Sequence, residues 1–294
     1  MNSLPADRRR RKYFLSNVYF LFLAVPVIIF LVFVAYMVFY LFRNGINVIS
    51  WEFITRPPER GMTAGGILPC IVGTLYVTLV SLIFSIPIGV FAAIYLAEYA
   101  PNNLLTRMIR SAVRSLAGIP SIVYGLFGVA LFVRGVHLGL SVLASGLTLG
   151  LMNLPWIIAT AEEALSSIPG SFREGALAVG ATKWEAIRHN VLPFAFPGIL
   201  TGILLALART MGETAPILFT GVTYFTRELP RSPLQKFMAL PYHLFALATQ
   251  HDQLMKARPI AFGTAAVLLI LVLMFDGVAF LLRMRIATAN KWQV

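Results

Sequence analysis

Six long apolar stretches constrain this chain more than any other feature of its sequence. They cover about residues 18–41, 71–97, 115–133, 138–161, 194–222 and 260–282. As helices, stretches of this length can cross the hydrocarbon core of a bilayer, which is about 30 Å thick. Because lipid offers no hydrogen-bond partners, the backbone groups must be satisfied within each segment, as they are in a helix. We therefore predict an all-α membrane protein with about six transmembrane helices.

The composition is that of an integral membrane protein. Of the 294 residues, 58% are hydrophobic and 12% are charged, whereas soluble domains carry about 25% charged residues. The net charge of +12 would also suit a nucleic-acid-binding protein, but the basic residues cluster at the ends of the apolar stretches. Nucleic acid is therefore not an expected partner. The single cysteine, Cys70, excludes an internal disulfide and is expected to be a buried apolar residue.

Basic residues at both ends of the chain predict its orientation. The run from Arg8 to Lys12 directly precedes the first apolar stretch, and Arg283, Arg285 and Lys291 follow the last one. By the positive-inside rule both termini are expected in the cytoplasm. The first stretch is too long for the core of a signal peptide, so we expect it to remain as a membrane anchor.

The segment from residue 171 to residue 193 is too polar to lie in a membrane and carries signals for two short helices. These are two capping-box patterns, Ser171 with Glu174 and Thr182 with Glu185. Gly180 lies between them and can end one helix and turn the chain. We predict a short helix, a bend at Gly180, a second short helix and a stop at Pro193. An ordinary surface loop with some helix is the alternative.

Within this segment, EGALAVGATKWEAIRHNVLP resembles the EAA loop of ABC-transporter permeases of the binding-protein-dependent import type. The matching positions are Glu174, Gly175, Ala176, Gly180, Ile187, Leu192 and Pro193. Gly175 stands where the family usually has alanine. In that family the loop is the cytoplasmic coupling helix that docks in a groove of the ATPase subunit. The resemblance therefore implies that these residues couple the chain to an ATPase, and that the fold is that of a type I importer permease.

The resemblance also suggests how the chain is divided. We expect a basic tail, the first transmembrane helix and an external connection in residues 1–66. The transmembrane domain of the ABC importer type is expected in residues 67–285, and a short cytoplasmic tail in residues 286–294.

Two opposite charges, Arg209 and Glu213, lie in the fifth apolar stretch. Each charge at that depth costs roughly 2.5–3.5 kcal/mol on insertion scales, and residues four apart on a helix share a face and can neutralise each other. Two interpretations are open. The pair either specifies helix packing alone, or lines a polar path in which Arg209 meets an anion, because guanidinium matches phosphate oxygens bidentately. Gly212 and Pro216 predict a bend nearby.

Four further sequence motifs resemble the phosphate-specific transport (Pst) permease, in particular its PstA-type subunit. They are GGILPCIVGTLYVTL at 65–79, AAIYLAEYAP at 92–101, GIPSIVYGLFG at 118–128 and ARTMGETAPILFT at 208–220. The resemblance implies that Arg209 and Glu213 serve phosphate passage. It also implies a complex in the bacterial inner membrane, with a second, PstC-type permease, two copies of an ATP-binding subunit and an extracytoplasmic phosphate-binding protein.

Other polar residues give weaker signals. Asp276 in the last apolar stretch is expected to bond within the helix bundle, and Glu98 and the Glu162–Glu163 pair are interpreted as charges at membrane boundaries. The histidines have no ligand spacing, so neither a metal site nor a cofactor is predicted; they are His137, His189, His243 and His251.

Motifs for ATP hydrolysis or covalent catalysis are not found in the sequence, which has no G-x-x-x-x-G-K-[ST], Gly-x-Ser-x-Gly or H-E-x-x-H. The chain is therefore expected to be a transport subunit and not an enzyme. The alternative is a self-contained ion-coupled transporter or channel for an anion, with Arg209, Glu213 and Asp276 as its relay. Such a protein would not need a docking segment with a glycine bend between capped helices.

Overall fold

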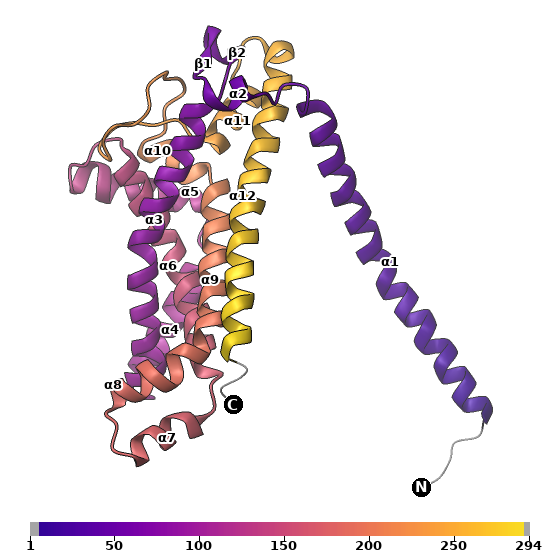
Figure 1. Ribbon diagram of the computed structural model, residues 1–294, viewed down its shortest axis with the longest axis vertical. Helices are drawn as coiled ribbons and strands as arrows, with labels where there is room; N and C mark the ends of the chain where they lie inside the picture. The colour runs from indigo at the N-terminus through magenta and orange to yellow at the C-terminus, as the bar shows by residue number, and fades with distance from the viewer. Residues whose placement is uncertain (1–5, 291–294) are drawn as a thin grey trace.

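The computed structural model describes residues 6–290 and is helical almost throughout (Figure 1). The α-helices are α1 (Ala6–Gly45), α2 (Trp51–Thr55), α3 (Leu68–Ile94), α4 (Leu104–Leu116), α5 (Ser121–Gly128), α6 (Val142–Ser166), α7 (Gly170–Ala178), α8 (Lys183–Ala186), α9 (Leu192–Gly212), α10 (Ala215–Thr220), α11 (Leu240–Thr249) and α12 (Leu254–Asn290). Two short strands, β1 (Pro58–Glu59) and β2 (Ala64–Gly65), pair antiparallel. A 3₁₀ turn, η1 (Arg60–Met62), joins them, and π-helical turns are η2 (Tyr95–Tyr99), η3 (Val129–Gly135) and η4 (Ile187–Val191).

Five helical segments of the described residues are long and apolar enough to cross a membrane, and there are six if a bent pair of helices is counted as one span. The five are Tyr19–Gly45, Leu68–Tyr99, Val142–Ser166, Lys183–Gly212 and Leu254–Arg285. The predicted fold class, an all-α membrane protein with about six spans, is confirmed.

The third span differs from the single helix predicted over residues 115–133. Two helical segments, Leu104–Leu116 and Ser121–Gly135, meet at an angle of 102°. Pro120 lies at this break; a proline removes a backbone donor and restricts the residue before it. Arg107 and Arg110 lie in α4, which Asn103 caps through a 2.9 Å hydrogen bond from Thr106 N.

The fifth span also breaks where one helix was predicted over residues 194–222. Helix α9 ends at Gly212, Glu213 has extended backbone angles, and α10 begins at Ala215. The predicted bend near Gly212 and Pro216 is thus a complete interruption. Pro216 has no N–H to donate to the carbonyl of Gly212, so the hydrogen-bond ladder cannot continue through this point.

Helices α3 and α6 pack closely against each other. An added Cβ at Gly146 would collide with Val80, and one at Gly150 would collide with Phe84. These glycines therefore bring the two backbones close together. Helix α9 packs on both α6 and α3, and α12 packs on α9.

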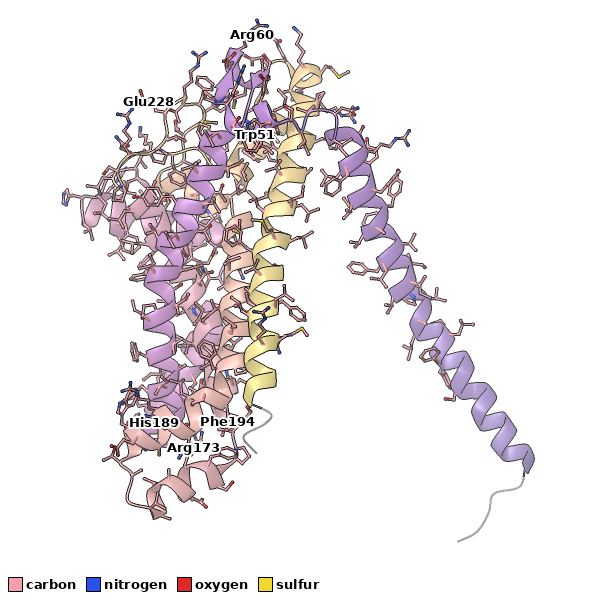
Figure 2. All side chains as sticks on the ribbon, in the orientation of Figure 1. Trp51, Arg60, Arg173, His189, Phe194 and Glu228 are labelled. Carbon is pink, nitrogen blue, oxygen red and sulfur yellow. The ribbon has the colours of Figure 1, made fainter. Side chains whose placement is uncertain are left out.

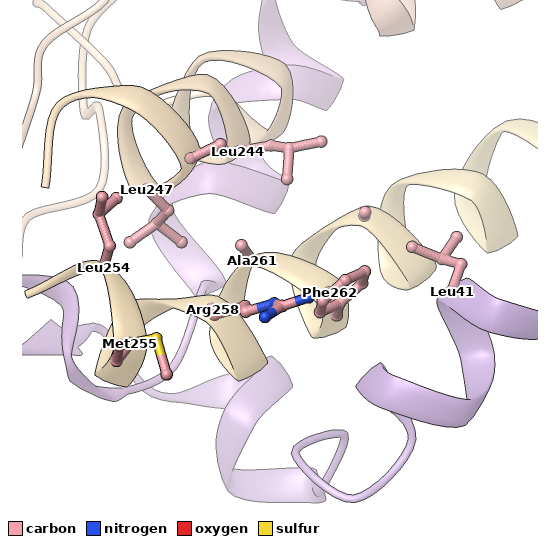
Figure 3. A pocket seen from close by; sticks show the side chains of 10 residues that line it. Leu41, Leu244, Leu247, Leu254, Met255, Arg258, Ala261 and Phe262 are labelled. Carbon is pink, nitrogen blue, oxygen red and sulfur yellow. The ribbon is translucent and has the colours of Figure 1, made fainter.

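Helix α1 stands apart from the bundle along most of its length (Figure 1). It approaches α12 near one end only, where the rings of Tyr40 and Phe262 meet edge to face at 5.7 Å. A largely apolar cleft of about 450 Å³ lies between α1, α11 and α12 beside this contact (Figure 3). Arg258 lines this cleft, and its guanidinium lies 5.7 Å from the centroid of the Phe262 ring.

The two ends of the bundle carry different elements. The β1–β2 hairpin and α11 lie at one end, while α7, α8 and the last turns of α12 lie at the other (Figure 1). Arg173 and His189 mark the end with α7, and Arg60 and Glu228 mark the opposite end (Figure 2). Residues 231–239, which precede α11, form an irregular segment.

Candidate functional site

The segment from residue 171 to residue 193 contains the predicted helix, bend and second helix. Helix α7 ends at Ala178, Gly180 has a φ of +89°, and α8 begins at Lys183. That positive φ favours glycine, which has no Cβ to clash. The predicted capping box at the second helix is present, with Thr182 N donating to Glu185 Oε2 at 2.8 Å and Glu185 N donating to Thr182 Oγ1 at 3.3 Å.

Two predictions for this segment are wrong. Ser171 does not cap the first helix, because α7 already begins at Gly170 after an N-cap at Pro169 that makes no side-chain hydrogen bond. Pro193 does not stop the second helix, because the chain continues through η4 into α9. Proline is compatible with the first turn of a helix, where the N–H has no intrahelical acceptor. In sequence alone, such a proline looks the same as one that ends a helix.

The residues matched to the EAA loop fall into two groups. Glu174, Gly175 and Gly180 are exposed, whereas Ala176 and Ile187 are buried toward the bundle. Leu192 and Pro193 are half-buried at the start of α9. Three large apolar side chains that sequence reasoning did not select are exposed on this segment: Leu177, Val179 and Trp184. Val179 is 86% exposed, which leaves its apolar side chain available to a partner.

Arg209 and Glu213 form an ion pair, as predicted, although Glu213 lies just beyond the end of α9. Arg209 Nε donates to Glu213 Oε1 at 3.2 Å, and the two side chains are 33% and 17% exposed. The Arg209 guanidinium also lies 5.5 Å from the ring centroid of Trp156 on α6. Within the described residues, this pairing uses Nε and leaves both Nη groups without a protein hydrogen-bond acceptor. Those Nη groups can bind an oxyanion.

A buried polar cluster lies directly behind Arg209. The side-chain amide of Asn153 donates to Thr210 Oγ1 at 2.6 Å and to Ser81 Oγ at 3.2 Å. These residues come from α6, α9 and α3, and all are at most 2% exposed. Asn153 therefore joins three spans beside the charged pair. Sequence reasoning missed this residue, although an asparagine inside an apolar stretch is itself a signal for a specific interhelical contact.

The remaining polar candidates do not join this site. No hydrogen-bond partner is found among the described residues for the buried Oδ1 of Asp276, so the expected bond within the bundle is absent there. His243 contacts Thr264, and His251 contacts the carbonyl of Gly61. Among the described residues, no group of three or more His, Cys, Asp or Glu side chains could hold a metal ion.

Glu98 and Glu162, interpreted as boundary charges, both form ion pairs. Glu162 contacts Arg110 of α4 at 2.6 Å, and Glu98 contacts Arg173 of α7. Neither pairing was predicted, because the partners are distant in sequence.

Comparisons with known proteins agree with this geometry. A family model described as a binding-protein-dependent transport system inner membrane component matches residues 85–288. The probable ABC transporter permease protein YqgI of Bacillus subtilis is 36% identical over 81% of this chain and 84% of that protein. The phosphate transport system permease protein PstA 1 of Mycobacterium tuberculosis H37Rv is 36% identical over 72% of this chain and 68% of that protein.

Solved structures show the same fold. A chain of a bacterial alginate ABC transporter, in complex with a pentasaccharide-bound periplasmic protein, aligns over 96% of this chain and 97% of its own, with a TM-score of 0.66 and 15% identity. A chain of the MetNI methionine ABC transporter aligns over 76% and 95%, with a TM-score of 0.59 and 20% identity. The resemblance drawn from the sequence motifs is confirmed. The chain belongs to the family of binding-protein-dependent transport system inner membrane components, the permease subunits of ABC importers.

Proposed function

We propose that the chain is the PstA-type permease subunit of an ATP-driven phosphate importer. The observation that carries the proposal is the guanidinium of Arg209, which lies in an otherwise apolar span and pairs with the Glu213 carboxylate through Nε alone. Relatives named as phosphate transport permeases support phosphate as the substrate, for example PstA of Haemophilus influenzae, which is 34% identical over 68% of this chain.

Arg209 would receive the phosphate and Glu213 would limit how tightly it is held. The free Nη groups can donate two parallel hydrogen bonds to phosphate oxygens. Glu213 competes for the same guanidinium, so an anion that binds there is also readily displaced. Transport needs such balanced binding, because a substrate must leave the pathway as well as enter it. The Trp156 ring holds the guanidinium from the other side.

The segment from residue 171 to residue 193 would dock the ATPase subunit. Its exposed apolar side chains, Leu177, Val179 and Trp184, offer a partner a contact surface beside the exposed Glu174 and Gly175. The ATP would be hydrolysed in that separate subunit. The proposed assembly also contains a PstC-type permease, a second copy of the ATPase and an extracytoplasmic phosphate-binding protein, in the bacterial inner membrane.

Phosphate uptake in cells tests this function. The chain would be produced together with its proposed partners in a host that lacks its own phosphate permeases, and uptake of labelled phosphate would be measured. We expect uptake to require the ATPase subunit and to fall to background in Arg209→Gln. Uptake that continues without the ATPase would instead support a self-contained ion-coupled transporter, and uptake that is unchanged in Arg209→Gln would refute the assigned pathway.

A further inference from the structure

Arg173 of α7 forms several hydrogen bonds with Glu98. Its Nε lies 3.1 and 2.9 Å from the two carboxylate oxygens, and its Nη2 donates to Oε1 of the same group. Glu98 belongs to η2, the π-helical turn that ends the span begun by α3. Its side chain is only 4% exposed, while that of Arg173 is 24% exposed. The pair thus fastens α7 to the end of the second span.

The same guanidinium also caps α6. Nη2 donates to the carbonyl of Leu165 at 2.9 Å, and Nη1 donates to the carbonyl of Ile168 at 2.8 Å. The last carbonyls of a helix have no intrahelical donor, so a side chain that supplies one fixes the helix end. One side chain therefore joins α7 to two spans at once.

The rest of this segment contacts the bundle through apolar packing and ring contacts. Ile187 and Val191 lie in a buried cluster that also contains Ala161 and Leu165 of α6. The rings of Phe172 and Phe194 meet edge to face at 4.9 Å, and the Lys183 ammonium lies 4.8 Å from the Tyr99 ring centroid. Multiple charge-assisted hydrogen bonds fix geometry better than these contacts do. Hydrogen bonds to Glu98 are also the main reason that the pKa of Arg173 is raised above its ordinary value, so Arg173 stays charged.

The two spans joined by Arg173 both reach the Arg209 site. Helix α6 carries Trp156, against the guanidinium of Arg209, and Asn153, against Thr210. Helix α3 carries Ser81, which accepts a hydrogen bond from Asn153. Packed helices move as stiff units, so a displacement at one end of a span is carried along it.

We propose that Arg173 is the joint that carries movement of α7 to the spans around Arg209. It is a positioning residue for the coupling of ATP hydrolysis to transport and does not touch the substrate. This inference rests on the proposed function, in which an ATPase subunit docks on the outer face of the 171–193 segment. Docking itself uses exposed side chains, whereas the joint lies on the bundle side. If the contacts of Arg173 are lost, the ATPase should therefore still bind, but its hydrolysis should no longer respond to the transmembrane spans.

Two conservative variants test the joint in the complete complex. Glu98→Gln keeps the side-chain shape and removes the charge, and Arg173→Lys keeps the charge and removes the fork of donors. The matched control is Glu162→Gln, which breaks the Arg110–Glu162 pair at the same end of α6. The Glu162 and Arg110 side chains are 15% and 27% exposed, and this pair does not involve α7. For each complex, in lipid vesicles, four quantities are measured: the ATPase retained on purification, its basal hydrolysis, the hydrolysis added by phosphate-loaded binding protein, and phosphate uptake.

We expect both joint variants to retain the ATPase and its basal hydrolysis, but to lose the hydrolysis added by loaded binding protein together with phosphate uptake. The Glu162→Gln control should keep all four. Normal stimulation and uptake in Glu98→Gln and Arg173→Lys would overturn the joint. So would an equal loss in the control, which would indicate general loosening of the bundle end. Loss of the ATPase itself from both joint variants would make Arg173 a docking or folding residue and contradict the inference. A wild-type chain that retains no ATPase would refute the proposed function instead.

Discussion

The guanidinium of Arg209 on α9 lies over the ring of Trp156 on α6, 5.5 Å from its centroid. On its other side, Glu213 accepts a hydrogen bond from Nε at 3.2 Å. The cation is therefore oriented by one contact along its own chain segment and one across the bundle. Since Thr210, the next residue, is bonded to Asn153 of α6, the end of α9 is fixed to α6 by two adjacent residues.

Loss of the Asn153 side chain should change transport as well as stability. In Asn153→Ala the buried hydroxyl of Ser81 loses the hydrogen bond from Asn153, whereas that of Thr210 keeps its bond to the carbonyl of Ala206. An unsatisfied buried polar group costs about 1–3 kcal/mol. We expect a lower melting temperature of the purified protein and a lower maximal uptake rate per folded molecule, because the end of α9 is no longer held at α6.

Thr148→Val is the matched control for Asn153→Ala. Thr148 is also fully buried on α6, but among the described residues its hydroxyl hydrogen-bonds only to the carbonyl of Ala144 in its own helix. We expect this variant to transport normally. If Asn153→Ala melts earlier yet transports at the wild-type rate per folded molecule, Asn153 stabilises the bundle without positioning Arg209.

Some local features of the 171–193 segment could be read from the sequence, although the equally local Ser171–Glu174 pattern did not form a capping box, because α7 begins at Gly170. The Thr182–Glu185 capping box and the Gly180 bend depend on residues within one or two turns, so their pattern determines their geometry. Pro193 was misread because a proline fits both the end of a helix and the first turn of the next. Whether the chain stops or continues there depends on the packing of α9.

The candidate site shows the same limit. The Arg209–Glu213 pair was predictable because the partners lie one helical turn apart, and Pro216 indicated a disturbance of the helix nearby. The bonds from Asn153 to Ser81 and from Arg173 to Glu98 cross 72 and 75 residues of chain. Such pairs depend on how the spans are arranged, and a single sequence does not contain that information in a local pattern.

Gly180→Val should weaken the docking of the ATPase. Its φ of +89° is strained for any residue with a Cβ, and most strained for a β-branched one. Apart from its chain neighbours, no atom of the described residues lies within 4 Å of a Cβ added there, so the effect would come from the backbone and not from a collision. We expect normal membrane insertion and a reduced yield of co-purified ATPase. Gly175→Ala, at a helical position with similar free space, serves as the control.

Wild-type levels of co-purified ATPase in Gly180→Val, together with full phosphate uptake, would count against the docking role of this segment.

The orientation in the membrane can be tested with single introduced cysteines. Glu228 and Ser171 are both exposed, at opposite ends of the bundle, and the native Cys70 is fully buried and should not react. If the N-terminus is cytoplasmic, an impermeant thiol reagent should label Glu228→Cys in intact cells and Ser171→Cys only after the cells are opened. The reverse pattern would overturn the proposed topology and remove the access of an ATPase to α7 and α8.

Arg209 and Glu213 allow the two interpretations of the charged pair to be separated. Breaking a fully buried ion pair by removing one partner costs about 3–5 kcal/mol; the cost should be smaller here, because Arg209 is about a third exposed. The single variants Arg209→Gln and Glu213→Gln should both lower membrane abundance, and the double variant should restore it, because no unpaired charge remains.

If the pair only specified packing, phosphate uptake would recover with abundance. We expect it not to recover, because the double variant has no fixed cation for the anion. The measurement is membrane abundance beside phosphate uptake in the two single variants and the double variant, with Glu162→Gln as a control for loss of an unrelated ion pair. Near-normal uptake in the double variant would refute the hypothesis that Arg209 contacts the substrate and would leave Arg209 as a packing residue.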